Sequence, residues 1–229
     1  MASAATADFP QLKHVTSPRY QRWTPLSGIA FVVFFVASVL ASSPPADTAS
    51  DTRWIASYTG HGNQAHHLAT GICLILAALS LISFICVLWT RIVHASRPTF
   101  PNPLPLVAAG VSAACIALGG VLMAVVSGSA LLGSSPVPSA ELLRFSNDGG
   151  FAMAGIGGML AAALCVACVS IQARGAAIFG RKLTIFSLVV AVVLLASFAF
   201  VPILALLAWL IVTAITLVRQ GEPDTMGAR

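Results

Sequence analysis

The chain has 229 residues, of which 58% are hydrophobic and only 8% are charged, and its formal net charge is +5. A soluble globular domain carries roughly 25% charged residues, so this composition excludes a soluble surface of ordinary kind. The basic residues flank apolar runs instead of forming one patch, which argues against a nucleic-acid partner. All five cysteines lie inside apolar runs, so no disulfide framework is predicted.

Residues 1–24 are predicted to form a polar cytoplasmic tail. Thr24 is a good helix cap and Pro25 fits the first helical position, so an apolar helix is expected over 25–41. Three further apolar runs cover about 66–89, 103–128 and 150–172. A helix needs about 20 apolar residues to cross a bilayer core of about 30 Å, so each run is interpreted as one transmembrane span.

The last apolar run, 183–218, holds 36 residues without a charge. One helix of that length would measure about 54 Å, well beyond the thickness of a bilayer core. Pro202 interrupts the backbone hydrogen bonds near the middle, so two helices turning near 200–202 are expected, in preference to one tilted helix. The sequence therefore predicts an all-α, polytopic bundle of six transmembrane helices over 25–219, followed by a cytoplasmic tail at 220–229.

The distribution of lysine and arginine supports six spans with both termini in the cytoplasm. Ten of the twelve basic residues fall on the side of the two termini, and only Arg53 and Arg144 fall on the other. Positively charged residues are enriched in cytoplasmic loops, so the larger set marks that side. Cleavage of a signal peptide after Ala41 is the alternative, although the polar stretch before the apolar core is long for such a peptide.

Two outer loops are longer than a connection requires, and each is predicted to hold a short amphipathic helix on the outer membrane interface. The apolar residues that define these helices are Trp54, Ile55 and Tyr58 in the first loop and Leu142, Leu143 and Phe145 in the second. Asn147 and Asp148 are then expected to cap the fourth span from outside.

The six predicted spans contain no Asp, Glu, Lys or Arg and no well-buried His. Proton relays and ion-coupled transporters usually need such residues at depth, so these classes are disfavoured, as are retinal and bis-histidine haem proteins. The side chains that offer chemistry all lie in or beside the outer loops, and they are His61, His66, His67, Glu141 and Asp148.

Histidine and carboxylate are natural zinc ligands, which makes a metal or acid–base site at these residues one hypothesis. However, His66 and His67 are adjacent, and a helix points neighbouring side chains about 100° apart. The preferred interpretation is therefore a set of interfacial polar residues with Asn63 as the helix cap, and no metal or cofactor is predicted.

Two patterns in the fourth span are interpreted as packing. Cys165 and Cys168 form a CxxC pair with no partner cysteines or histidine, which favours two small apolar side chains over redox chemistry. A second pattern places small residues at every fourth position, at Gly150, Ala154, Gly158 and Ala162. Such a stripe lets helix backbones approach closely, and packing inside the bundle is preferred over a dimer face.

The segment RWTPLSG at 22–28, followed by FVVFFV, resembles the start of a group of six-helix actinobacterial integral membrane proteins. The outer segments 49–51, 55–58 and 62–63 and the final hairpin, with Phe200-Val201-Pro202 and Trp209, are similar to that group as well. The resemblance implies a multi-pass protein of a bacterial plasma membrane. The group is largely uncharacterised, so the resemblance implies no catalytic or binding residues.

The leading functional hypothesis is a non-enzymatic membrane protein. It would bind membrane lipid or another apolar molecule, or serve as a subunit or partner of an envelope complex or as a homo-oligomer. One alternative is a membrane-bound enzyme with an outer-face site of histidine and carboxylate. Another is a transporter that does not depend on buried ionisable residues.

Overall fold

The structure is a computed structural model that describes residues 24–42, 44–46, 48–96, 101–133, 135–196 and 201–220. Nearly all of the two predicted cytoplasmic tails, and Phe200 of the expected turn, lie outside the described residues. Within the described ranges every regular element is helical.

A short 3-10 turn at Thr24–Leu26 leads into α2 (Ser27–Ala41). The remaining elements are α3 (Asp51–Ser57), α4 (His61–Ala95), α5 (Leu104–Gly133), α6 (Ala140–Phe151), the π-helical segment η2 (Ala152–Gly157), α7 (Gly158–Gly175), α8 (Arg181–Leu195) and α9 (Val201–Gln220).

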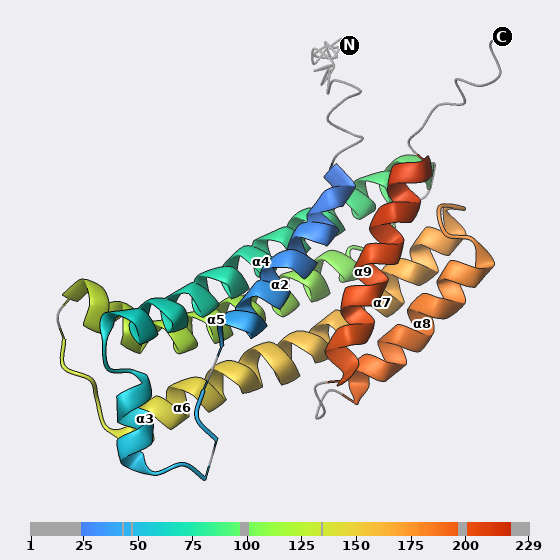
Figure 1. Ribbon diagram of the computed structural model, residues 1–229. Helices are drawn as coiled ribbons and strands as arrows, with labels where there is room; N and C mark the ends of the chain where they lie inside the picture. Colours follow the sequence, from blue (N-terminus) through green and yellow to red (C-terminus); the bar gives the residue numbers. More distant parts are fainter. Residues whose placement is uncertain are drawn as a thin grey trace, which may run out of the picture.

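The helices close into a ring. α2 packs against α4 and α9, α5 packs between α4 and α7, and α8 packs between α7 and α9. α2 begins and α9 ends at the same end of the bundle, where the hairpin between α7 and α8 also lies (Figure 1). α3 and the beginning of α6 lie at the opposite end.

Four helices are long and apolar enough to cross a membrane: His61–Ala95, Leu104–Gly133, Ala140–Gly175 and Pro202–Gln220. The helical bundle and its membrane character therefore agree with the sequence. The 183–218 run is divided as expected, because α8 ends at Leu195 and α9 begins at Val201. α2 and α8 have 15 residues each, about 22 Å of helix.

Trp209 is fully buried and ties three of these helices together. Its indole N–H donates a hydrogen bond to the hydroxyl of Ser187 on α8, with 2.8 Å between the heavy atoms. Its ring meets Phe84 of α4 edge-on, with 6.0 Å between ring centroids. The indole therefore satisfies its one polar group inside an otherwise apolar core.

The longest helices are α4, α5 and the helix that α6, η2 and α7 form together. They extend beyond the end of α2 and beyond the hairpin of α8 and α9 (Figure 1). α4, with 35 residues, measures about 52 Å, so its length exceeds a bilayer core by about 20 Å. We call this end of the protein the head. It consists of the first turns of α4, the last turns of α5, and α6, together with the short helix α3 that packs against α6. The head has a small core of its own, formed by Trp54, Tyr58, Val126, Ala140 and Leu143.

The second predicted outer helix and the fourth predicted span are one continuous helix from α6 through η2 into α7. Asn147 and Asp148 therefore lie inside a helix and do not cap one, contrary to expectation. The cause is packing against α5, because Ser146 and Asn147 are buried and the Ser146 hydroxyl donates to the carbonyl of Leu122. This burial outweighs the low helix propensity of the glycine pair that follows Asp148.

α4 likewise begins before the expected position, at His61. Gly60, with φ of +90°, turns the chain in a conformation that favours glycine. Asn63 is not the helix cap but sits in the first turn, where its amide donates to the carbonyl of Thr59 at 3.2 Å. Gln64 donates in the same way to the carbonyl of Tyr58 at 3.2 Å.

The first amphipathic helix exists as α3, capped by the Ser50 hydroxyl, which accepts from the Arg53 backbone N–H. On its apolar face, Trp54 and Tyr58 are buried in the core of the head. Ile55 remains exposed. Two of the three residues that define the predicted apolar face are therefore buried inside the protein, and the placement of this helix on the outer membrane interface stays a prediction.

Candidate ligand-binding cavity

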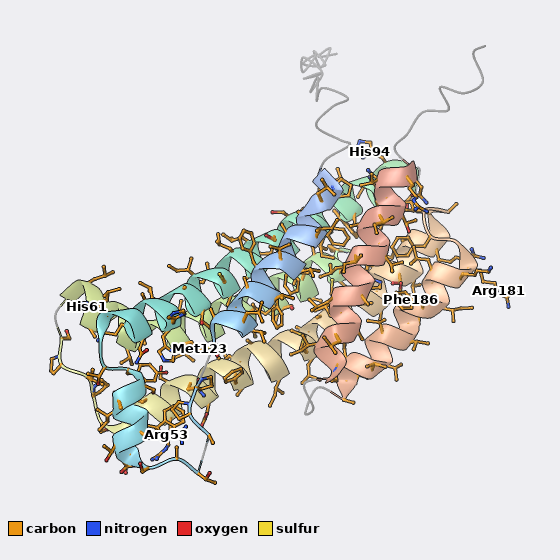
Figure 2. All side chains as sticks on the ribbon, viewed as in Figure 1. Arg53, His61, His94, Met123, Arg181 and Phe186 are labelled. Carbon is orange, nitrogen blue, oxygen red and sulfur yellow. The ribbon has the colours of Figure 1, made fainter. Side chains whose placement is uncertain are left out.

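A cavity of about 320 Å³ lies where the head meets the main bundle. It is bounded by the last turns of α2, by α4 and α5, by the end of α6 with η2, and by the first turn of α9. In Figure 2, Met123 of α5 lies in the space between the end of α2 and α6. Small-molecule sites usually occupy about 300–1,000 Å³, so this cavity is at the lower end of that range.

Its walls are predominantly apolar, and its rim reaches the outer surface of the bundle. Phe35, Leu74 and Met123 form part of the buried lining. Val39 on α2 is 49% exposed and Ile156 on η2 is 38% exposed, so these two side chains form an open edge. An apolar chain can therefore enter from the side that would face lipid.

The π-helical segment forms one wall. The backbone N–H of Gly158 bonds to the carbonyl of Met153, five residues earlier, which is the hydrogen bond of a π-helix. Such segments are rare and are found frequently at functional sites. Here the segment presents Ala152, Gly155 and Ile156 to the cavity.

Glycine contacts hold the helices behind this wall tightly together. A Cβ on Gly119 of α5 would lie 2.6 Å from the carbonyl oxygen of Gly150, and one on Gly120 would lie 2.7 Å from the carbonyl oxygen of Gly71. Gly155 differs, because a Cβ there would meet nothing within 4 Å. The helices behind this wall are thus closely packed, whereas the space at Gly155 is open.

Four side chains with a hydroxyl or carboxyl group line the cavity, and they are Ser38, Ser42, Thr70 and Asp148. The Ser38 hydroxyl donates to the carbonyl of Phe35 at 2.7 Å, and the Thr70 hydroxyl donates to the carbonyl of His66 at 3.0 Å. Both hydroxyls are therefore satisfied by their own helices and act as weakly polar surface. Asp148 is exposed at the rim, and its Oδ1 accepts from the side-chain amide of Asn147 at 3.2 Å.

Of the site residues expected from the sequence, only Asp148 lines the cavity. His61, His66 and Glu141 are exposed on the head. His67 is 7% exposed and stacks on Tyr58, with 4.0 Å between ring centroids and 4° between ring planes. Within the described ranges, no three His, Cys, Asp or Glu side chains come close enough to hold a metal ion.

Tyr58 is a buried ionisable residue of the head. Burial, with a smaller contribution from the negative charge of Asp148, raises the pKa of Tyr58 to about 12. The phenol is therefore neutral at physiological pH, and it is stacked on an imidazole. This environment is the reverse of what a tyrosine nucleophile or base needs.

Arg144 has a structural role in the head. Its guanidinium lies 2.8 Å from the Asp51 carboxylate, donates to the carbonyl of Ala49 at 2.9 Å, and lies 5.7 Å from the centroid of the Trp54 ring. These three contacts attach α6 to α3. The sequence placed Arg144 on the outer side but offered no sign of this arrangement.

The small-residue stripe faces inward. Gly150, Ala154, Gly158 and Ala162 are all buried. A Cβ on Gly158 would lie 2.9 Å from Ile116 of α5, and the Ser112 hydroxyl donates to the Gly158 carbonyl at 2.8 Å. Cys165 is buried and Cys168 is half-buried, and both are free thiols.

The cavity itself was not foreseen from the sequence. Its walls come from segments far apart in the chain, and no local pattern brings them together. The one usable signal is the run GGFAMAGIGG at 149–158, because glycines and alanines at this density permit an irregular helix.

Comparison of the chain with protein-family models, with curated protein sequences and with solved structures finds no match. The function is therefore inferred from the residues and their geometry.

Proposed function

We propose that this chain is a multi-pass protein of a bacterial plasma membrane that binds an apolar molecule in the cavity between α2 and η2. In the proposed topology six helices span the bilayer, and both termini are cytoplasmic. Partnership with a larger envelope complex or with a second copy stays a prediction.

The distribution of charge supports this topology. Figure 2 labels Arg181 and His94 toward one end of the molecule and Arg53 and His61 toward the head. Five described basic residues lie toward the first end, namely Arg91, Arg174, Arg181, Lys182 and Arg219, whereas Arg53 and Arg144 lie in the head. The positive-inside rule therefore favours a cytoplasmic position for the first end and an outer position for the head.

The observation that carries the binding proposal is the cavity, with its apolar lining and its open edge at Val39 and Ile156. It lies at the end of α2 that is nearer the head and beside the first turn of α9, and both of these helices are apolar. In the proposed topology the cavity lies at the level of the outer leaflet, where lipid chains are the most abundant apolar molecules.

Gly155→Phe tests the proposal, because Gly155 lines the cavity and a Cβ added there meets nothing within 4 Å. Gly110→Phe is the matched control, since a Cβ on Gly110 of α5 also meets nothing within 4 Å, and Gly110 does not line the cavity. Native mass spectrometry of protein released from nanodiscs measures the retained lipid. We expect one retained lipid in the wild type and the control and none in Gly155→Phe; equal retention by all three contradicts the proposal.

A further inference from the structure

The cavity has a polar end and an apolar end, and the chain directions of its walls show which is which. α2 runs toward the head, so Ser42 lies nearer the head than Phe35. α4 and α6 start in the head, so Thr70 lies nearer to it than Leu74, and Asp148 lies nearer to it than Ile156. On α2, on α4 and on the helix from α6 into η2, the lining residue nearest the head is polar; Ser38, one turn further from the head on α2, is polar as well.

This polarity is that of an amphiphile lying along the bundle. The polar group of the lipid would lie at Asp148, where the head of the protein joins the main bundle. The acyl chain would then run away from the head of the protein, past Leu74 and Ile156. An apolar molecule without a head group would make no use of the Asp148 carboxylate.

The charge at the polar end is negative. Among the described residues that line the cavity, Asp148 is the one that carries a charge. Arg144, one helical turn earlier on the same face, would ordinarily pair with Asp148. Instead the Arg144 guanidinium binds Asp51 and the carbonyl of Ala49. Among the described residues, the partner recorded for the Asp148 carboxylate is the neutral amide of Asn147.

We infer that the ligand is an outer-leaflet lipid whose head group carries a protonated amine, with the ammonium at Asp148 and one acyl chain in the cavity. The inference rests on the proposed function and adds the chemical class of the ligand. A head group with a net negative charge and no amine is repelled by Asp148, and the described lining residues offer it no compensating cation.

The test uses three lipids with identical acyl chains: phosphatidylethanolamine, phosphatidylglycerol and uncharged diacylglycerol. Native mass spectrometry of the full chain in detergent, titrated with each lipid, gives the apparent affinities. An ion pair at a partly exposed site contributes at most about 1 kcal/mol, so we expect phosphatidylethanolamine to be preferred over phosphatidylglycerol by about two- to fivefold. The preference should shrink with added salt.

Asp148→Asn removes the charge and keeps the shape, so it should bring the two phospholipids to equal affinity and leave diacylglycerol unchanged. Glu141→Gln is the matched control, since Glu141 is an exposed acid two turns earlier on α6 and does not line the cavity. The control should retain the wild-type preference.

The variants distinguish a failure of the proposed lipid-binding function from a failure of the inferred amine head group. If Gly155→Phe abolishes binding of all three lipids but Asp148→Asn keeps the wild-type preference, the cavity binds lipid and the inferred amine is wrong. The inferred amine is also wrong if the wild type binds phosphatidylethanolamine and phosphatidylglycerol with equal affinity. If Gly155→Phe binds all three lipids as the wild type does, the cavity is not the site and the proposed function is wrong as well.

Discussion

The imidazole of His67 on α4 lies flat against the phenol ring of Tyr58 at the end of α3, with 4.0 Å between ring centroids. Both side chains are buried at the base of the head, close enough to the cavity for the charge of Asp148 to act on Tyr58. His67, one of the candidate residues from the sequence, is thus packed against Tyr58 inside the head, beside a cavity whose lining is predominantly apolar.

The raised pKa of Tyr58 predicts a loss of stability in alkali. The neutral phenol is favoured in the folded protein, so its stabilising contribution is complete below pH 10 and is lost as pH rises from 10 toward 12. Thermal unfolding of the wild type and of Tyr58→Phe, followed between pH 8 and pH 12, measures this effect. Above pH 10 the melting temperature of the wild type should fall relative to that of Tyr58→Phe; curves that stay parallel across this range would show that Tyr58 does not titrate in this way.

Removing Arg144 should loosen the head. Arg144→Gln loses a partly exposed ion pair, a hydrogen bond to a backbone carbonyl and a cation–π contact, which together are worth about 1–2 kcal/mol. Hydrogen exchange of the α3 amides should therefore accelerate by about five- to thirtyfold. Arg53→Gln, an exposed arginine on α3 itself, should leave exchange nearly unchanged. If hydrogen exchange accelerates equally in both variants, the contacts of Arg144 do not hold α3 in place more than an exposed arginine does.

The close approach of α5 to the long helix depends on glycine. Gly119→Ala places a methyl group 2.6 Å from the carbonyl oxygen of Gly150, a backbone atom that cannot move without shifting the helix, so we expect a cost of about 1–3 kcal/mol. Gly110→Ala, on the same helix but with open space around it, should be neutral or slightly stabilising. Thermal unfolding in detergent compares the two, and equal melting temperatures would contradict this packing.

Ser187→Ala should destabilise the bundle by leaving the buried Trp209 indole N–H without an acceptor, at a cost of about 1–3 kcal/mol. Thr216→Ala is the control, since that exposed hydroxyl bonds only to its own helix at Val212. The fluorescence of a variant that retains only Trp209 should change in Ser187→Ala but not in the control. No spectral change in either would show that the hydrogen bond is not formed.

Much of the fold follows from the sequence, because long apolar runs require helices and Pro202 requires a break. The continuity of α6 into α7 does not follow, since Asn147, Asp148 and the next two glycines have the local chemistry of a helix start. Burial of Ser146 and Asn147 against α5 overrides that local signal.

The candidate site was predicted less well, for a physical reason. Spacing alone showed that small residues line one face of the fourth span, but not that Gly119 of α5 meets them. The cavity depends on where α2 ends relative to η2 and α9, which is a property of the assembled ring. Asp148 was recognised as an outer carboxylate, whereas its position on an apolar cavity required the structure.

The most direct measurement is photocrosslinking in the native membrane, with a phosphatidylethanolamine that carries a diazirine on its acyl chain. Peptide mapping then locates the labelled residues. The lipid-binding account predicts labelling concentrated on Phe35, Leu74, Gly155 and Ile156, which is lost in Gly155→Phe and kept in Gly110→Phe. Labelling spread only over outward-facing side chains such as Leu79 and Leu118, and unchanged in Gly155→Phe, would contradict it.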